Sequence, residues 1–575
     1  MTRIRLLYLY VATIIALAML LFGLSNLLRV VLDRTIDDAG DTLFVGDEDS
    51  LRRLVARYVA ISVIALPVWL GHWSIAQRGA SAETPRGQAE RFAPERRLFL
   101  AVVLALVTGL PAAIAAWQLI EGLLARLLGV ADPPRLAGSV AALIVTGSAW
   151  SYHRRVQAAD TVRDPRLVEI DDWRRLEVYG LAIAGLFVFA RGLDATLELL
   201  IRLVDDAASR EVALTSARWW AGPLAGALAS LTIGAALWAI HWLPATALAG
   251  TGSPAGIAER RSLVRRFART IILLATILTA LTQAGIALAA LVALALGMAA
   301  SEIDLPGDGD DLQTTVAHAL LTGLVYALIW VYLADRTRQE EPPLEAASPG
   351  DADGAEPRRV YAYLVALVGL GFFVGGGIQI LSILGDLLTR RGDRVVVDDD
   401  VWRRPLALAI ASLVVGLATW TWEWSRAQRR ALGAPGDGQV GGPIPVPAER
   451  RSPVRRAYLV IAAGAGLIIL LVSGAIALYA LLSAVLAVED DLGERLADVA
   501  GWLIGGAFLV AYHVSVLRAD TLAVRSAPAG DGPALTVDLQ LTVPAGTELE
   551  PLLARLRKAL PADATIGRSE TGLEG

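Results

Sequence analysis

The chain has 575 residues, of which 55% are hydrophobic and only 19% are charged, and its mean hydropathy is +0.53. This balance excludes an ordinary soluble domain, because too few polar residues remain to cover the surface of a protein of this size. The net charge of −5 offers no basic surface to nucleic acid, and the absence of cysteine excludes disulfides, thiolate metal sites and thiol catalysis.

Long stretches without charge predict helices that cross a membrane. Examples are residues 6–24, 271–300 and 458–485. Each is long enough for a hydrocarbon core of about 30 Å at about 1.5 Å of rise per residue. The basic start "MTRIR" also fits a signal peptide, but the apolar segment runs on to about Val31 and its pattern recurs downstream. We therefore expect a retained first span.

The apolar pattern repeats along the chain as a hairpin of two helices. Each unit opens with an arginine before a long apolar helix, then has a short acidic loop and a second helix; the opening arginines are Arg5, Arg97, Arg175, Arg266, Arg359 and Arg456. We place the six hairpins at 1–80, 91–165, 171–250, 258–339, 358–432 and 454–522. The predicted fold is all-α: a polytopic membrane protein with about twelve transmembrane helices in six tandem parallel two-helix repeats.

Two linkers and a tail interrupt this regularity. Residues 340–357 and 433–453 are rich in proline, glycine and acidic residues, which predicts disordered connections. In the tail, 530–575, residues 534–543 alternate apolar and polar like a strand, and residues 548–560 read as an amphipathic helix. A small cytoplasmic tail of this kind needs support, so we expect it to pack on a protein partner or on the cytoplasmic loops.

Arginine asymmetry predicts the orientation. The loops within hairpins carry 11 arginines against 25 acidic residues, whereas arginine outnumbers the acids at the N-terminus and between hairpins. The positive-inside rule then places both termini in the cytoplasm. Lys558 is the only lysine, as expected of a GC-rich bacterial gene, so we expect a bacterial plasma membrane.

A tryptophan motif closes most second helices. It reads "WLGHW" at 69–73, "WSYHR" at 150–154, "WAIHW" at 238–242 and "WTWEW" at 420–424. Its tryptophans, with the equivalent one in the fourth hairpin, are Trp69, Trp73, Trp150, Trp238, Trp242, Trp330, Trp420 and Trp424. Indole rings favour the headgroup boundary, so we interpret these residues as an interfacial belt that sets helix depth.

The fourth position of this motif supplies a second interpretation. It holds His72, His153, His241, Leu333, Glu423 and His513. These side chains would form one ring around a cytoplasmic vestibule that binds a metal or haem, or passes protons or a substrate. Each hairpin offers a single histidine and Leu333 interrupts the ring, so we favour the belt and expect no cofactor or metal.

A charge ladder follows one face of the fifth predicted span. Arg191, Asp194, Glu198 and Arg202 are three, four and four residues apart. Charges inside a membrane cost at least about 2.5 kcal/mol each near its centre, so the ladder either protrudes into solvent or lines an ion or substrate path. His318, early in the eighth span, is a single histidine for which we expect hydrogen-bonded packing.

The paired pattern of Arg-Arg-x-Tyr and "LPVWLGHW" resembles a bacterial membrane family named only as domain of unknown function 5671. The resemblance implies an integral membrane protein and carries no activity or site residues. No enzyme motif occurs in the sequence, so we expect no catalysis. A transporter or channel-like protein would use a polar path. A structural or sensory module would have a dry interior and present its linkers and tail to partners. We favour the module, because the polar residues do not occupy matching positions between repeats.

Overall fold

The computed structural model describes residues 3–36, 48–209, 218–303, 305, 311–340, 352–389, 402–432, 448–486 and 492–526. Every regular element in these ranges is a helix, as the sequence predicts. The predicted strand and helix of the tail lie outside the described residues. Most residues of the two predicted linkers also lie outside the described residues. Of the linker residues that are described, 352–357 form the start of one long helix and 448–451 form a short helix. The contacts of residues 448–451 with the long helices are given below.

The long helices form three consecutive sets of four. The first set is α1 (Arg3–Asp33), α2 (Glu48–Ser81), α4 (Pro94–Val102) continued through a π-helical turn η1 (Val103–Gly109) into α5 (Leu110–Leu127), and α6 (Ala137–Arg163). The second is α8 (Asp172–Ser209), α9 (Ala221–Ala249), α11 (Leu263–Ala295) and α13 (Leu312–Glu340). The third is α14 (Ala352–Thr389), α15 (Arg403–Leu432), α17 (Pro453–Val485) and α18 (Leu492–Arg525).

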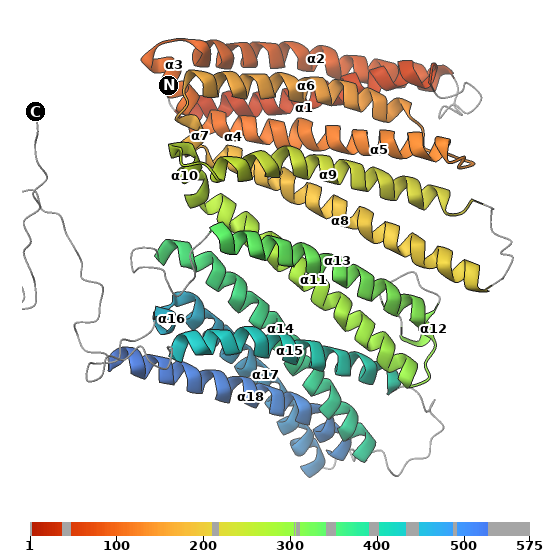
Figure 1. The fold of residues 1–575 in the computed structure, drawn as a ribbon, viewed down its shortest axis with the longest axis vertical. Helices are drawn as coiled ribbons and strands as arrows, with labels where there is room; N and C mark the ends of the chain where they lie inside the picture. The colour runs from red at the N-terminus through yellow and green to blue at the C-terminus, as the bar shows by residue number, and fades with distance from the viewer. Residues whose placement is uncertain are drawn as a thin grey trace, which may run out of the picture. The chain divides into compact units, whose positions relative to one another are not determined.

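Within each set the first helix packs on the second and the fourth, and the third packs on the fourth. Between sets, the third helix of one set packs on the next: α5 meets α9, and α11 meets α14 and α15. Figure 1 shows the long helices lying side by side. Four short helices lie at one end of them, α3 (Pro85–Phe92), α7 (Leu167–Ile170), α10 (Pro254–Arg261) and α16 (Ala448–Arg451). We call this the short-helix end. The fifth, α12 (Ala300–Ile303), lies at the opposite end.

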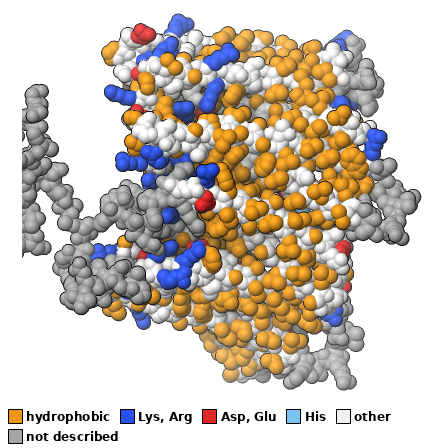
Figure 2. Space-filling model, viewed as in Figure 1, with side chains coloured by type: hydrophobic (Ala, Val, Ile, Leu, Met, Phe, Trp, Pro, Cys, Tyr) orange, Lys and Arg blue, Asp and Glu red, His pale blue; other side chains and the backbone are white. Residues whose placement is uncertain are grey.

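Eleven helices of the described chain are long and apolar enough to cross a membrane, so this is a multi-pass membrane protein. The long helix that falls short is α6, whose second half carries His153, Arg154, Gln157 and Asp160 among other polar residues. Figure 2 shows hydrophobic side chains covering the middle of the visible face, with arginines gathered towards its two ends. Such a surface suits acyl chains around the middle and water at the ends.

Glycines allow the first two helices of a set to cross closely. A Cβ built at Gly234 of α9 would lie 2.2 Å from the backbone nitrogen of Phe189 in α8. A Cβ at Gly416 of α15 would lie 2.2 Å from the backbone nitrogen of Phe373 in α14. No side chain fits at either position, which is the close backbone approach typical of packed membrane helices.

Candidate functional site

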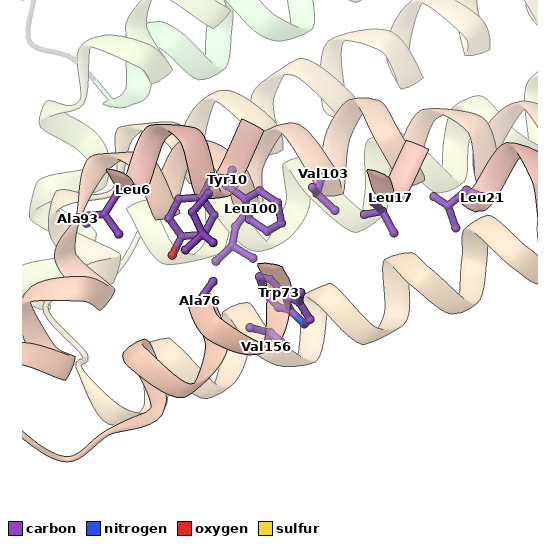
Figure 3. Close-up of a cluster of buried hydrophobic side chains, with 12 residues drawn as sticks. Leu6, Tyr10, Leu17, Leu21, Trp73, Ala76, Ala93, Leu100, Val103 and Val156 are labelled. Atoms are coloured by element: carbon purple, nitrogen blue, oxygen red, sulfur yellow. The ribbon is translucent and has the colours of Figure 1, made fainter. Parts of the chain in front are cut away.

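The most buried charged groups of the molecule lie near the short-helix end. In the first set the guanidinium of Arg96 is fully buried. Its Nε donates to Asp160 Oδ2 at 2.8 Å and its Nη2 to Gln77 Oε1 at 3.0 Å. It lies 5.8 Å from the ring centre of Trp73. Figure 3 shows Trp73 and Tyr10 within the apolar cluster around this position. One arginine therefore joins α2, α4 and α6.

The third set repeats the arrangement with its own residues. Arg455 donates from Nε to Asp520 Oδ2 at 2.6 Å and from Nη2 to Gln428 Oε1 at 2.8 Å. Its guanidinium lies 5.1 Å from the ring centre of Trp424 and 3.4 Å from the Tyr363 hydroxyl. These contacts join α14, α15, α17 and α18.

The second set has the same core. Arg265 donates to the Tyr179 hydroxyl at 2.6 Å and lies 5.9 Å from the ring centre of Trp242. We call each such group, a buried arginine with its tyrosine and tryptophan, an arginine node. The three nodes are Arg96 with Tyr10 and Trp73, Arg265 with Tyr179 and Trp242, and Arg455 with Tyr363 and Trp424.

A glutamate on a short helix completes the second and third nodes. Tyr179 donates to Glu259 of α10, and Tyr363 donates to Glu449 of α16 at 2.6 Å. The glutamate of α16 also accepts from Arg359 Nε at 3.2 Å. These contacts hold residues 448–451 in a helix, which a Pro- and Gly-rich composition alone does not predict.

Glu259 and Glu449, and Glu90 of α3, are each followed by an arginine that binds the end of a long helix. Arg91 donates to the Ala80 carbonyl of α2 at 2.6 Å and Arg450 to the Ala431 carbonyl of α15 at 2.6 Å. Arg260 donates to the Ala249 carbonyl of α9. The last carbonyls of a helix lack partners within it and carry its partial negative charge, so a cation is stabilising there.

A different polar cluster joins α8 and α13. Asp194 Oδ1 accepts from the Thr322 hydroxyl at 2.6 Å and lies 3.1 Å from His318 Nε2. Of the rest of the predicted ladder, Arg191 is mostly exposed and lies 3.4 Å from Asp194 Oδ2, while Glu198 pairs with Arg202 on the surface of their own helix. The structure therefore brings Asp194 into a contact between α8 and α13, with His318 and Thr322 as its partners.

The family model described as "Domain of unknown function (DUF5671)" matches residues 6–150, 175–332 and 359–508. The chain belongs to this family. Each DUF5671 match begins in the first helix of a set and ends in the fourth, so one match spans two of the predicted hairpins. The resemblance seen in the sequence is confirmed. No curated protein and no solved structure matches the chain.

The five predicted ring residues are distributed over the three DUF5671 copies. His153 and His513 are fully buried beside the node tryptophans of the first and third copies, and each Nδ1 bonds the carbonyl four residues earlier. His241 is buried in the second copy, His72 is more exposed, and Glu423 pairs with Arg426 at 3.7 Å. In the described part of the chain, no three His, Asp or Glu side chains lie close enough together to hold a metal ion.

The eight predicted belt tryptophans fall into two groups in the DUF5671 copies. Trp73, Trp242, Trp420 and Trp424 are buried in the protein, while Trp69, Trp150, Trp238 and Trp330 are half-buried. Three indole nitrogens of the first group donate to tyrosine hydroxyls: Trp73 Nε1 to Tyr152 at 2.7 Å, Trp420 Nε1 to Tyr458 at 3.0 Å, and Trp424 Nε1 to Tyr512. Rings that anchor a helix in headgroups lie on the outer surface, so the buried four pack helices together instead.

The node arginines stand one residue before the arginines that the repeat pattern predicted as helix starts. The pattern predicted the second arginine of each pair, whereas the first, Arg96, Arg265 or Arg455, is buried. A detectable signal was present: a glutamate stands six residues before each buried arginine, at Glu90, Glu259 and Glu449. The tyrosines that complete the nodes lie 86 to 92 residues away in the chain, so no local pattern connects them.

Proposed function

We propose that this DUF5671 protein is a structural and interaction module of the membrane and not an enzyme. The observation that carries this proposal is the recurrence of the arginine node in all three copies. The most buried arginines join helices near one end of the molecule, which is what a rigid scaffold needs. We also propose that each copy derives from two tandem hairpins, giving six parallel two-helix repeats in all.

We further propose that the protein lies in a bacterial plasma membrane with both termini and the short-helix end in the cytoplasm. The excess of arginine between hairpins supports this orientation. The linkers and the 530–575 tail then face the cytoplasm, where a protein partner can reach them.

Photocrosslinking tests the interaction role. A benzophenone amino acid placed in turn at several positions of 530–575 is expected to give the same discrete protein adduct in cells, from the cytoplasmic side. Adducts with lipid alone, or none at all, would contradict the proposal. Single cysteines in this cysteine-free chain, labelled in vesicles of known sidedness, check the orientation independently.

One observation favours a second candidate, a proton or ion path through the middle copy. The Asp194, His318 and Thr322 cluster lies in membrane-spanning helices, where a charge is costly. Asp194 stands fifteen residues after Tyr179, the node tyrosine of its copy. Fifteen residues after the node tyrosines of the other two copies stand Ser25 and Ile378. The four-helix fold therefore forms without this charge, so packing alone does not account for it.

Proton flux into proteoliposomes separates the two candidates. The module predicts no flux above that of protein-free vesicles. The path predicts a flux that Asp194→Asn abolishes and Glu198→Gln preserves, because Glu198 pairs with Arg202 on its own helix.

A further inference from the structure

An apolar groove lies between the second and third DUF5671 copies. It is a cavity of about 200 Å³ bounded by α11, α14 and α15. Its lining is almost entirely hydrophobic and includes Phe372 and Leu408, which are 50% and 38% exposed on the side of the helices. The groove therefore opens laterally, within the spans that cross the membrane.

The junction between the first and second copies shows what normally fills this place. There α5 packs on α9, and Trp117 Nε1 donates to Ser230 Oγ at 3.0 Å. The equivalent helices at the second junction are α11 and α15. Trp117 stands twelve residues before Gly129, which follows the end of its helix and has φ +73°. Twelve residues before the matching glycine, Gly297 with φ +71°, stands Gly285.

The serine opposite is the same at both junctions. Ser230 precedes the node tryptophan Trp242 by twelve residues, and Ser412 precedes Trp424 by twelve. Ser412 and Gly285 both line the groove. The groove is thus the space that an indole side chain occupies at the first junction, left open because the tryptophan is replaced by glycine. A Cβ built at Gly285 would meet no atom within 4 Å.

An open apolar space on the membrane side of a helix bundle is filled by what surrounds it. Atoms that line an empty groove lose their dispersion contacts, whereas a hydrocarbon chain restores them without desolvating a polar group. The length of the groove fits one leaflet. From Leu408 to Thr419 along α15 is eleven residues, about 16 Å at 1.5 Å per residue, or roughly half of a 30 Å hydrocarbon core.

We propose that this groove binds one acyl chain of a membrane phospholipid, with the headgroup at the Arg404 end. Arg404 precedes Leu408 by one helical turn, so both lie on the same face of α15, and its side chain is exposed where that helix begins. A cation at that position attracts the phosphate. The opposite end of the groove, at Thr419, lies deep among the helices because Thr419 is buried. The proposal concerns a binding site and goes beyond the proposed module function.

The decisive variant is Gly285→Trp, which supplies the side chain found at the first junction. The protein is reconstituted in nanodiscs, extracted gently and weighed by native mass spectrometry. The parent is expected to retain one phospholipid per chain and Gly285→Trp none. The matched control is Gly464→Trp in α17, where a Cβ also meets no atom within 4 Å and which does not line this groove. Gly285→Leu, a smaller filler, guards against a variant that fails to fold, and an unchanged melting temperature shows that each variant is folded.

Photocrosslinking locates the chain. A phosphatidylglycerol with a diazirine near the carboxyl end of one acyl chain should label the peptide around Leu408, and one with a diazirine near the methyl end should label the peptide around Thr419. Equal phospholipid retention by the Gly285→Trp and Gly464→Trp proteins, or none by the parent, would overturn the site. The reverse order of labelling would overturn the placement of the headgroup.

Discussion

The arginine node of the third copy gives the sharpest prediction for stability. We consider Arg455→Met, which keeps the length of the side chain and removes its charge. The guanidinium is buried and bonds Asp520 and Gln428. Removing it leaves the Asp520 carboxylate in the protein interior, with Arg450 Nε 3.6 Å from its Oδ1.

Breaking a buried ion pair from one side costs about 3–5 kcal/mol, because the remaining charge stays desolvated. The residual contact to Arg450 favours the lower end, so we expect Arg455→Met to lower the free energy of unfolding by about 3 kcal/mol. The control is Arg456→Met at the next residue, which is exposed. A surface substitution of that kind changes stability by no more than about 0.5 kcal/mol.

The assay is reversible unfolding in mixed micelles, followed by tryptophan fluorescence. The 15 tryptophans of the chain report on global unfolding, and Trp424, which lies 5.1 Å from the guanidinium, is one of them. Adding Asp520→Leu to Arg455→Met should restore part of the loss, because the orphaned charge is removed as well. The node does not stabilise the fold as described if Arg455→Met and Arg456→Met lower the free energy of unfolding equally. The same holds if adding Asp520→Leu to Arg455→Met lowers it further.

Two further predictions use matched pairs of variants. Gly416→Ala should destabilise the protein by about 1–3 kcal/mol, because its Cβ would overlap the backbone of the neighbouring helix. Gly371→Ala, with no atom within 4 Å of its Cβ, should be neutral or stabilising by up to about 1 kcal/mol. Thermal melting in detergent compares the two variants, and a larger loss of stability for Gly371→Ala would refute the argument from close helix crossing. Trp73→Phe should lower the free energy of unfolding by about 1–2 kcal/mol, because the hydrogen bond to the Tyr152 hydroxyl is lost. Trp422→Phe, which changes an exposed ring, should have little effect on stability. Equal effects in the same melting assay would indicate that the hydrogen bond of the buried indole nitrogen does not stabilise the fold.

Local sequence was enough to predict the kind of protein. Long apolar segments can be satisfied in a bilayer only as helices, so composition and segment length led to an all-α multi-pass protein and to the DUF5671 resemblance. Composition alone does not predict the short helix at residues 448–451, which is held by the contacts of Glu449 with Tyr363 and Arg359.

The candidate sites were less predictable, because burial depends on which segments meet. Arg455 and Arg456 are both arginines before an apolar run, yet one is buried in a node and the other is exposed. Similarly, Asp194 was visible as one charge of a ladder, but its contact with His318 spans 124 residues of sequence and depends on how α8 packs on α13.

By itself, then, the sequence determined what is set within a segment: which stretches are helices that suit a membrane, where they end and how their pattern recurs. Only the tertiary structure decided which of two adjacent arginines carries a node, which tryptophans are buried, and where a glycine leaves a groove that a tryptophan fills at the other junction. The physical reason is that hydrophobicity and helix length belong to one segment, whereas desolvation, hydrogen-bond partners and cavities arise only where segments far apart in the chain pack together.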